Sequence, residues 1–157
     1  MKETRQLEFK SDISNTFLKT VSAFANYDGG QILFGVGDTG EIIGLKDPVQ
    51  TCLAIENKMN DAIRPQPQYE LSVNDRDKTV TLTVEAGRAK PYTYKSKAYR
   101  RNDTATIEVD ELELSRLILH GRNIHYEELP ADSQELSFSE LERRAKQEIG
   151  VKSLNKD

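Results

Sequence analysis

The chain contains 157 residues, of which 36% are hydrophobic and 31% are charged, and its formal net charge is −4. This length suits one domain followed by a tail. No apolar stretch approaches the roughly 18 residues that a bilayer span needs, so we expect no membrane span, and the acidic balance argues against a uniformly basic nucleic-acid binder. The first residues form no apolar signal region and the single cysteine, Cys52, cannot form an internal disulfide, so the expected location is the cytoplasm.

The first third of the chain predicts a helix between strands. Residues 7–10 alternate apolar and charged, as a half-buried strand does, and apolar residues at helical spacing follow from 13 to 25. The Gly29-Gly30 pair ends that helix. Two short apolar runs, residues 32–36 and 41–45, then flank a glycine-rich turn, so we expect two strands joined by a tight turn.

Three further groups of elements follow in order. Asp47 is a capping residue before Pro48, and together they begin a helix predicted to run to Arg64 and to be stopped by the prolines at 65 and 67. Asp110 and Glu113 form a capping box for another helix, which Gly121 closes. Between these helices, alternating residues predict a hairpin and then two short strands, at 69–73, 79–84, 91–94 and 98–101.

The composition changes at residue 125. Residues 125–136 are polar and acidic around a proline, which is typical of a linker. Residues 137–157 predict one more helix and a tail, with little left for the helix to pack on. We therefore expect a domain at residues 1–124, a linker at 125–136, and at 137–157 the beginning of a following region of a longer protein.

Two motifs that suggest ligand sites are better explained otherwise. The G-x-G-x-x-G pattern at residues 35–40 needs a helix directly after it to hold a pyrophosphate, and a strand is predicted there instead. We therefore expect no nucleotide cofactor. His120 and His125 lie five residues apart without cysteine partners, which is not the spacing of a helical zinc site, so they are expected to be solvated.

A basic segment between residues 88 and 101 contains six cations and no acidic residue. Its cations could contact phosphates, and its three interleaved tyrosines could stack on bases. The alternative is a solvated hairpin whose tyrosines face the core. The candidate nucleic-acid-binding residues are Arg88, Lys90, Lys95, Lys97, Tyr99, Arg100 and Arg101, with Tyr92 and Tyr94 as the other two rings.

Three carboxylates form a second candidate site. Glu8 on the first predicted strand and Asp38 at the end of a neighbouring one could converge at a sheet end, and a bend would be needed to bring Glu3 to them. Such acids hold Mg²⁺ or Mn²⁺ in enzymes that hydrolyse phosphodiesters, because the metal lowers the pKa of its bound water. The alternative is three solvated charges. Lys10 is a further candidate catalytic residue.

Several motifs occur in order along the first 120 residues: E-F-K at 8–10, A-F-A-N at 23–26, G-G at 29–30, G-V-G-D at 35–38 and Y-R-R at 99–101. Together they resemble the Schlafen-type AlbA-like domain. The resemblance implies an α+β fold, and we expect a mixed or antiparallel sheet of about six strands with two to three packed helices. It also implies nucleic-acid binding, and in bacteria a position at the N-terminus of proteins described as transcriptional regulators or carrying an ATPase-like part.

In animal Schlafens the domain is a metal-dependent ribonuclease that acts on structured RNA such as tRNA, and its acidic triad falls on Glu3, Glu8 and Asp38. This chain departs from that pattern in two ways. It has one lobe where the animal enzymes have two, so a homodimer would be needed to rebuild the groove. It also has Gly37 before Asp38 where a second acid is often found.

Three functions are therefore expected in order. The first is DNA or RNA binding as part of a transcriptional regulator, and the second is a divalent-metal-dependent ribonuclease. The third is a sensor or assembly interface for a downstream ATPase-like region.

Overall fold

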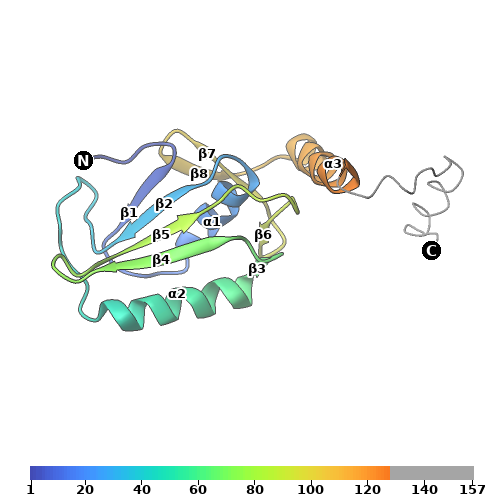
Figure 1. Ribbon diagram of the computed structural model, residues 1–157. Helices are drawn as coiled ribbons and strands as arrows, with labels where there is room; N and C mark the ends of the chain where they lie inside the picture. Colours follow the sequence, from blue (N-terminus) through green and yellow to red (C-terminus); the bar gives the residue numbers. More distant parts are fainter. Residues whose placement is uncertain (128–157) are drawn as a thin grey trace, which may run out of the picture. The chain divides into compact units, whose positions relative to one another are not determined.

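The computed structural model describes residues 1–127, of which Met1–Ile124 form one compact unit. Its centre is a four-stranded mixed sheet (Figure 1), in which β1 runs parallel to β2 and the other pairs are antiparallel. The strand order is β1 (Leu7–Lys10), β2 (Gly30–Phe34), β5 (Thr79–Val84) and β4 (Tyr69–Asn74). Two ribbons of two strands each pair β3 (Ile63–Arg64) with β6 (Thr93–Tyr94) and β7 (Tyr99–Asn102) with β8 (Ala105–Glu108). The predicted α+β class is confirmed, and the described strands are divided among three sheets.

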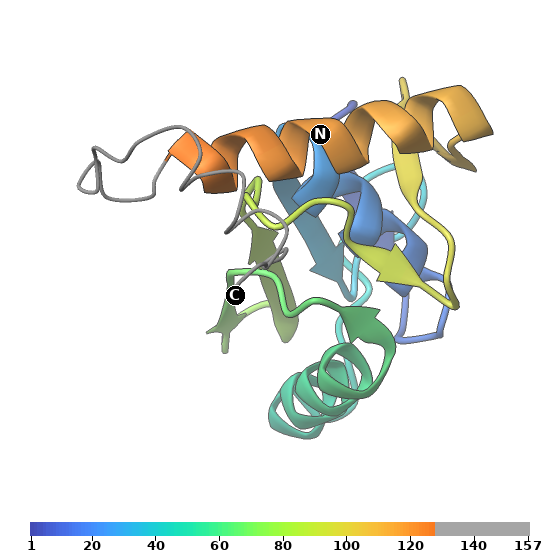
Figure 2. The same cartoon turned by 90° about the vertical axis from the view of Figure 1, so that its right-hand side faces the viewer.

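Helix α1 (Phe17–Asn26) is the core of this fold. It contacts β6, β7 and β8 as well as β5 and α2, so it is covered on several sides (Figure 2). Nine of its ten residues are buried, and Lys19 is exposed. A helix that is apolar or small on nearly all sides is stable only when surrounded in this way. The ring of Phe17 meets that of Phe34 on β2 edge to face, with centroids 5.4 Å apart.

Helix α2 (Pro48–Ala62) begins as predicted, because the Asp47 side chain accepts a hydrogen bond from the Gln50 N–H at 3.2 Å. The β4–β5 hairpin is also confirmed. Helix α3 (Glu111–Glu127) begins at the predicted cap, where the Glu113 N–H donates to Asp110 at 2.8 Å.

Gly121 does not end α3, and that prediction was wrong. The helix continues to Glu127, and Gly121 is buried within it. A Cβ atom at this position would lie 2.3 Å from the carbonyl oxygen of Lys90. The glycine is therefore required for the close packing of α3 against the backbone of Lys90.

The strand predicted at residues 41–45 is not formed. One isolated bridge, between Val36 and Ile42, replaces it. The backbone of this segment turns instead: Gly44 has a φ of 86°, and the N–H groups of Ile43 and Gly44 both donate to the Gly35 carbonyl. Ile42 and Ile43 are consequently 50% and 55% exposed, which their apolar character did not predict.

The strands predicted around residues 95–97 exist but have other partners. β6 pairs with β3, and β7 pairs with β8. The partner strands β3 and β8 were not predicted from the sequence. The predicted linker at 125–136 begins inside α3, and the segment 137–157 lies outside the described residues, so that boundary stays a prediction. Among the residues described, no helix is both long and apolar enough to span a bilayer.

Candidate nucleic-acid interface

Two buried side chains of α1 hold the basic segment. Asn26 Nδ2 donates to the Tyr92 carbonyl at 3.0 Å, and the Tyr92 N–H donates to Asn26 Oδ1 at 2.7 Å. One helical turn earlier, the Ser22 hydroxyl donates to the same carbonyl at 2.7 Å and accepts the Tyr99 N–H at 3.1 Å. Ser22 and Asn26, four residues apart on one face of α1, thus provide hydrogen-bond partners for backbone groups of Tyr92 and Tyr99, on either side of residues 93–98.

Between these two anchors the chain makes a tight turn. Tyr94 and Lys97 exchange two backbone hydrogen bonds, of 2.9 and 3.0 Å. Lys95 and Ser96, at the centre of the turn, have φ values of 54° and 67°, the left-handed geometry of the turns that join paired strands. Lys95 and Lys97 are exposed in this turn.

The tyrosines of the segment face the core. Tyr92, Tyr94 and Tyr99 are 4%, 6% and 7% exposed, and burial raises the pKa of Tyr99. This corrects the prediction that Tyr99 stacks on bases and agrees with the alternative of a hairpin with inward tyrosines. Strand β7 alternates: Tyr99 and Arg101 point inward, and Arg100 points outward.

Lysines of α1, α2 and the turn lie over the rings of Tyr94 and Tyr99 or line a hollow with Tyr94. Lys95 Nζ lies 5.4 Å from the centroid of the Tyr94 ring, and Lys19 Nζ of α1 lies 5.8 Å from that of Tyr99. Lys58 of α2 lines a hollow of about 440 Å³ together with Lys95 and Tyr94. We call Lys19, Lys58, Lys95 and Lys97 the lysine cluster.

Lys19 and Lys58 were not predicted as part of this surface, because they lie far from the basic segment along the chain. A signal existed for Lys19, which is a charged residue inside an otherwise apolar helical run. Acidic neighbours are few and exposed: Lys97 pairs with Glu108 at 3.8 Å, and Asp61 lines the hollow. Exposed pairs of this kind neutralise little charge, because water screens them.

The remaining predicted cations lie elsewhere. Arg88 is exposed. Lys90 is half-buried, its Nζ lies 3.3 Å from His120 Nδ1, and burial lowers its pKa. His120 is exposed, as predicted. Arg100 is also exposed but lines a different cleft.

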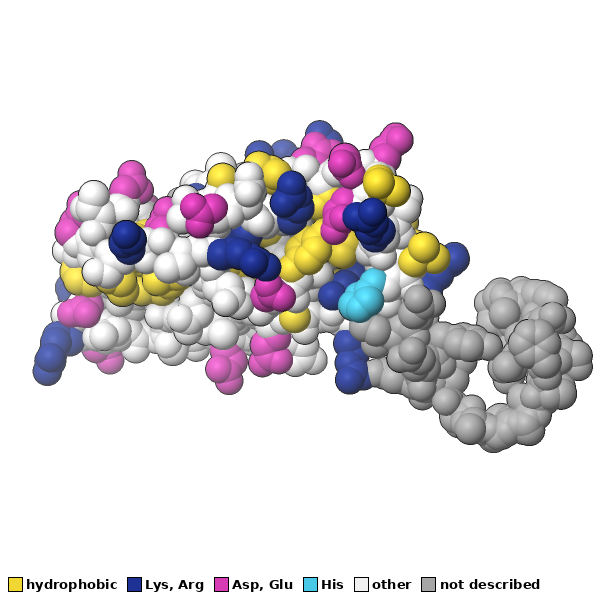
Figure 3. Space-filling view, turned by 90° about the horizontal axis from the view of Figure 1, so that it is seen from above, with side chains coloured by type: hydrophobic (Ala, Val, Ile, Leu, Met, Phe, Trp, Pro, Cys, Tyr) yellow, Lys and Arg dark blue, Asp and Glu magenta, His cyan; other side chains and the backbone are white. Residues whose placement is uncertain are grey.

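That cleft, of about 560 Å³, lies between the N-terminal segment, the end of α1, β7–β8 and the start of α3. Two of its cations have acidic partners: Arg5 pairs with Asp28 at 2.5 Å, and Arg116 with Glu113 at 3.4 Å. Glu113 also accepts a hydrogen bond from the Tyr27 hydroxyl at 2.5 Å. Burial, together with this hydrogen bond, raises the pKa of the Tyr27 hydroxyl. Figure 3 shows both charge signs interspersed on this face, which is therefore not a basic surface.

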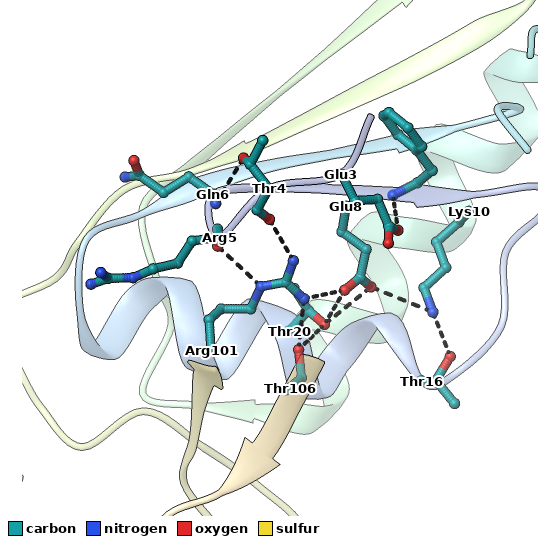
Figure 4. Close-up of polar contacts among 11 residues, drawn as sticks. Glu3, Thr4, Arg5, Gln6, Glu8, Lys10, Thr16, Thr20, Arg101 and Thr106 are labelled. Carbon is teal, nitrogen blue, oxygen red and sulfur yellow. Dashed lines mark hydrogen bonds and ion pairs between the residues drawn. The ribbon is translucent and has the colours of Figure 1, made fainter. Parts of the chain in front are cut away.

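The predicted catalytic residue Glu8 is half of a buried ion pair (Figure 4). Its Oε1 lies 2.6 Å from Nη1 of Arg101, and the two residues are 7% and 8% exposed. The Thr20 hydroxyl lies 3.1 Å from both oxygens of Glu8. Lys10 Nζ lies 3.4 Å from Oε2 and donates to Thr16 at 3.1 Å. Both carboxylate oxygens therefore already have partners.

Arg101 uses all its nitrogens inside the protein. Nη1 also donates to Thr106 on β8 at 3.1 Å, Nε donates to the Arg5 carbonyl at 3.0 Å, and Nη2 donates to the Thr4 carbonyl at 2.8 Å (Figure 4). Its guanidinium carbon lies 5.6 Å from the centroid of the Phe24 ring. Arg101 thus joins β7 to the N-terminal segment, and the prediction that it contacts phosphates is not supported by this placement.

A comparison of the sequence with protein-family models gives a match. The family model described as "Schlafen, AlbA_2" matches residues 3–110. The chain belongs to the Schlafen AlbA_2 family. The resemblance drawn from the sequence motifs is thereby confirmed.

Solved structures similar to this Schlafen AlbA_2 domain include a crystal structure of a protein from Corynebacterium diphtheriae, with a TM-score of 0.54 and 18% identity over 72% of this chain. The match covers 23% of that protein. Another is the solution structure of the N-terminal domain of an ATP-dependent DNA helicase RecG-related protein from Nitrosomonas europaea, with a TM-score of 0.48 and 26% identity over 67% of this chain and 83% of that one. No curated protein matches the sequence.

The acids of this Schlafen AlbA_2 domain do not fit the metal centre that the resemblance implied. Glu3 Oε2 accepts the Phe9 N–H at 2.9 Å, Glu8 is held by Arg101, and Asp38 is exposed in its turn. Over residues 1–122, whose side chains are described, no three acidic, histidine or cysteine side chains gather as metal ligands. The ribonuclease alternative stays a prediction from the resemblance.

Metal binding can be tested directly. A ligand that binds only the native state raises the unfolding temperature. Because the described side chains form no such cluster of metal ligands, we expect millimolar Mn²⁺ to leave the unfolding temperature unchanged. Differential scanning fluorimetry with and without Mn²⁺ measures this. A rise that disappears in Glu8→Gln but persists in Glu70→Gln, an exposed control on β4, would contradict the expectation.

Proposed function

We propose that this Schlafen AlbA_2 domain binds nucleic acid, DNA or RNA, and that the lysine cluster is its contact surface. Membership of the family supports the class of function. The observations that carry the surface are that Lys58 of α2 and Lys95 of the turn line one hollow, and that Lys19 of α1 lies over the ring of Tyr99, two residues after Lys97.

The net charge of −4 is compatible with this proposal, because a polyanion responds to the local field. At physiological salt, charges are screened beyond roughly 8 Å, so acidic side chains farther than this from the cluster have little effect on a phosphate held there. The Ser22 and Asn26 anchors also fix the turn before a ligand arrives. A fixed turn loses less conformational entropy on binding than a mobile one.

The triple variant Lys19→Gln, Lys95→Gln, Lys97→Gln tests the surface. Each lost phosphate contact reduces the slope of log K against log salt by about 0.9 on duplex DNA, so we expect the slope to fall by about 2 to 3. At about 0.1 M salt, the dissociation constant should rise on the order of a hundredfold. Fluorescence anisotropy of a labelled duplex, titrated at several salt concentrations, measures both quantities.

The matched control is Lys2→Gln, Lys46→Gln, Arg76→Gln, which removes the same three charges. These residues are exposed and belong to segments at the opposite end of the central sheet from β3 and β6 (Figure 1). Binding by the control should change by no more than about twofold, because long-range charge effects are screened. Equal losses in the two variants would show that only net charge matters and would refute the surface.

Four expectations from the sequence stay predictions. They are that the domain is part of a transcriptional regulator, that it forms a homodimer, that an ATPase-like region follows it, and that the protein is located in the cytoplasm.

A further inference from the structure

The phenylalanine and tyrosine side chains of the described residues do not offer an exposed stacking surface. Each phenylalanine and tyrosine from residue 1 to 122 is buried or half-buried, and none is exposed. Tyr27 and Tyr69 are the half-buried ones, and the hydroxyl of Tyr27 is bound to Glu113. Proteins that bind single strands combine a basic groove with rings on which successive bases stack. The lysine cluster has the cations, but the rings beside them, Tyr94 and Tyr99, are buried.

Within the lysine cluster, ammonium groups lie over the rings. Lys95 Nζ lies over Tyr94 and Lys19 Nζ over Tyr99, and both tyrosines are less than a tenth exposed. A base approaching this surface therefore meets a charged ammonium group before a ring. Lysine ammonium groups act as point charges, which suit phosphate oxygens and carry no information about base identity.

We infer that the ligand is double-helical nucleic acid, held by its phosphates and without base stacking. This inference rests on the proposed function. A duplex presents one negative charge per roughly 1.7 Å of its axis, and each phosphate contact releases about 0.9 of a counterion, against about 0.7 on a single strand. With four lysine contacts, the slopes of log K against log salt differ by about 0.8. A duplex and a single strand bound equally well at about 1 M salt would therefore differ roughly sixfold at about 0.1 M salt, and the duplex would be the tighter ligand.

Three labelled ligands of one length test the inference: a duplex of about 20 base pairs, one of its single strands, and an abasic strand of the same length that keeps the phosphates. Anisotropy titrations should show the duplex bound roughly sixfold more tightly than the single strand. The single strand and the abasic strand should bind equally, because removing bases removes no contact. The lysine-cluster triple variant should lose affinity for all three ligands.

The outcomes separate the inference from the proposed function. A single strand that binds more tightly than the duplex, or that loses affinity when its bases are removed, would overturn the inference and leave nucleic-acid binding intact. No binding of any ligand at low salt, or an unchanged affinity in the triple variant, would overturn the proposed function itself.

Discussion

Replacing Arg101 by methionine should lower the free energy of unfolding by about 3 to 5 kcal/mol, because it leaves Glu8 as a buried charge without its guanidinium partner. The substitution also removes the hydrogen bonds to the carbonyls of Thr4 and Arg5. Methionine keeps an unbranched stem against Phe24, so packing is lost least. Urea denaturation followed by circular dichroism measures the change.

Arg100→Met is the matched control. Arg100 is the preceding residue of β7 and is exposed, so this variant should stay within about 0.5 kcal/mol of the wild type. The double variant Glu8→Leu, Arg101→Met should recover part of the stability lost by Arg101→Met alone, because replacing both members of a buried pair removes the unpaired charge. A fully stable Arg101→Met variant, or a double variant that loses the sum of both single effects, would contradict the ion-pair explanation.

The same variants address nucleic-acid binding. Where Arg101→Met remains folded, its salt slope for duplex binding should match that of the wild type, because Arg101 is not in the lysine cluster. A slope reduced by about one would mean that this arginine contacts a phosphate.

Arg100 and Arg101 show how far sequence alone reaches. The period of two in a strand predicts that neighbouring residues point to opposite faces. It does not say which face is buried. That choice depends on Glu8, 93 residues away, whose carboxylate draws Arg101 inward. Local charge counting therefore grouped a core residue with a surface residue.

Local signals were sufficient where the deciding contact is local. Asp47 caps α2 through a residue three positions later, and the β4–β5 hairpin closes on its own turn. The strand predicted at residues 41–45 was wrong for a local reason, the turn at Gly44 that leaves Ile42 exposed. The helix end predicted at Gly121 was wrong because the packing of Gly121 against Lys90 is a tertiary contact that no short sequence window contains. The lysine cluster likewise combines residues from α1 and α2 with the basic segment.

Asn26→Ala should lower the free energy of unfolding by about 2 to 3 kcal/mol, because it leaves the buried N–H of Tyr92 without an acceptor. The Tyr92 carbonyl keeps its bond from Ser22, which limits the loss. Asn60→Ala, an exposed substitution of the same type within α2, should be neutral or slightly stabilising, since alanine favours helices. Thermal and urea denaturation of the two variants make the comparison.

The same substitution separates geometry from charge. Asn26→Ala removes no cation but releases one anchor of the turn that carries Lys95 and Lys97. Duplex affinity should therefore fall several-fold while the salt slope keeps its wild-type value, because the number of phosphate contacts is unchanged. A slope reduced as in the lysine-cluster variant would mean that the turn no longer reaches the ligand. Unchanged stability together with unchanged affinity would show that the anchor does not hold the turn. The expected pattern, weaker binding at a constant slope, would identify Asn26 as a positioning residue for the lysine cluster.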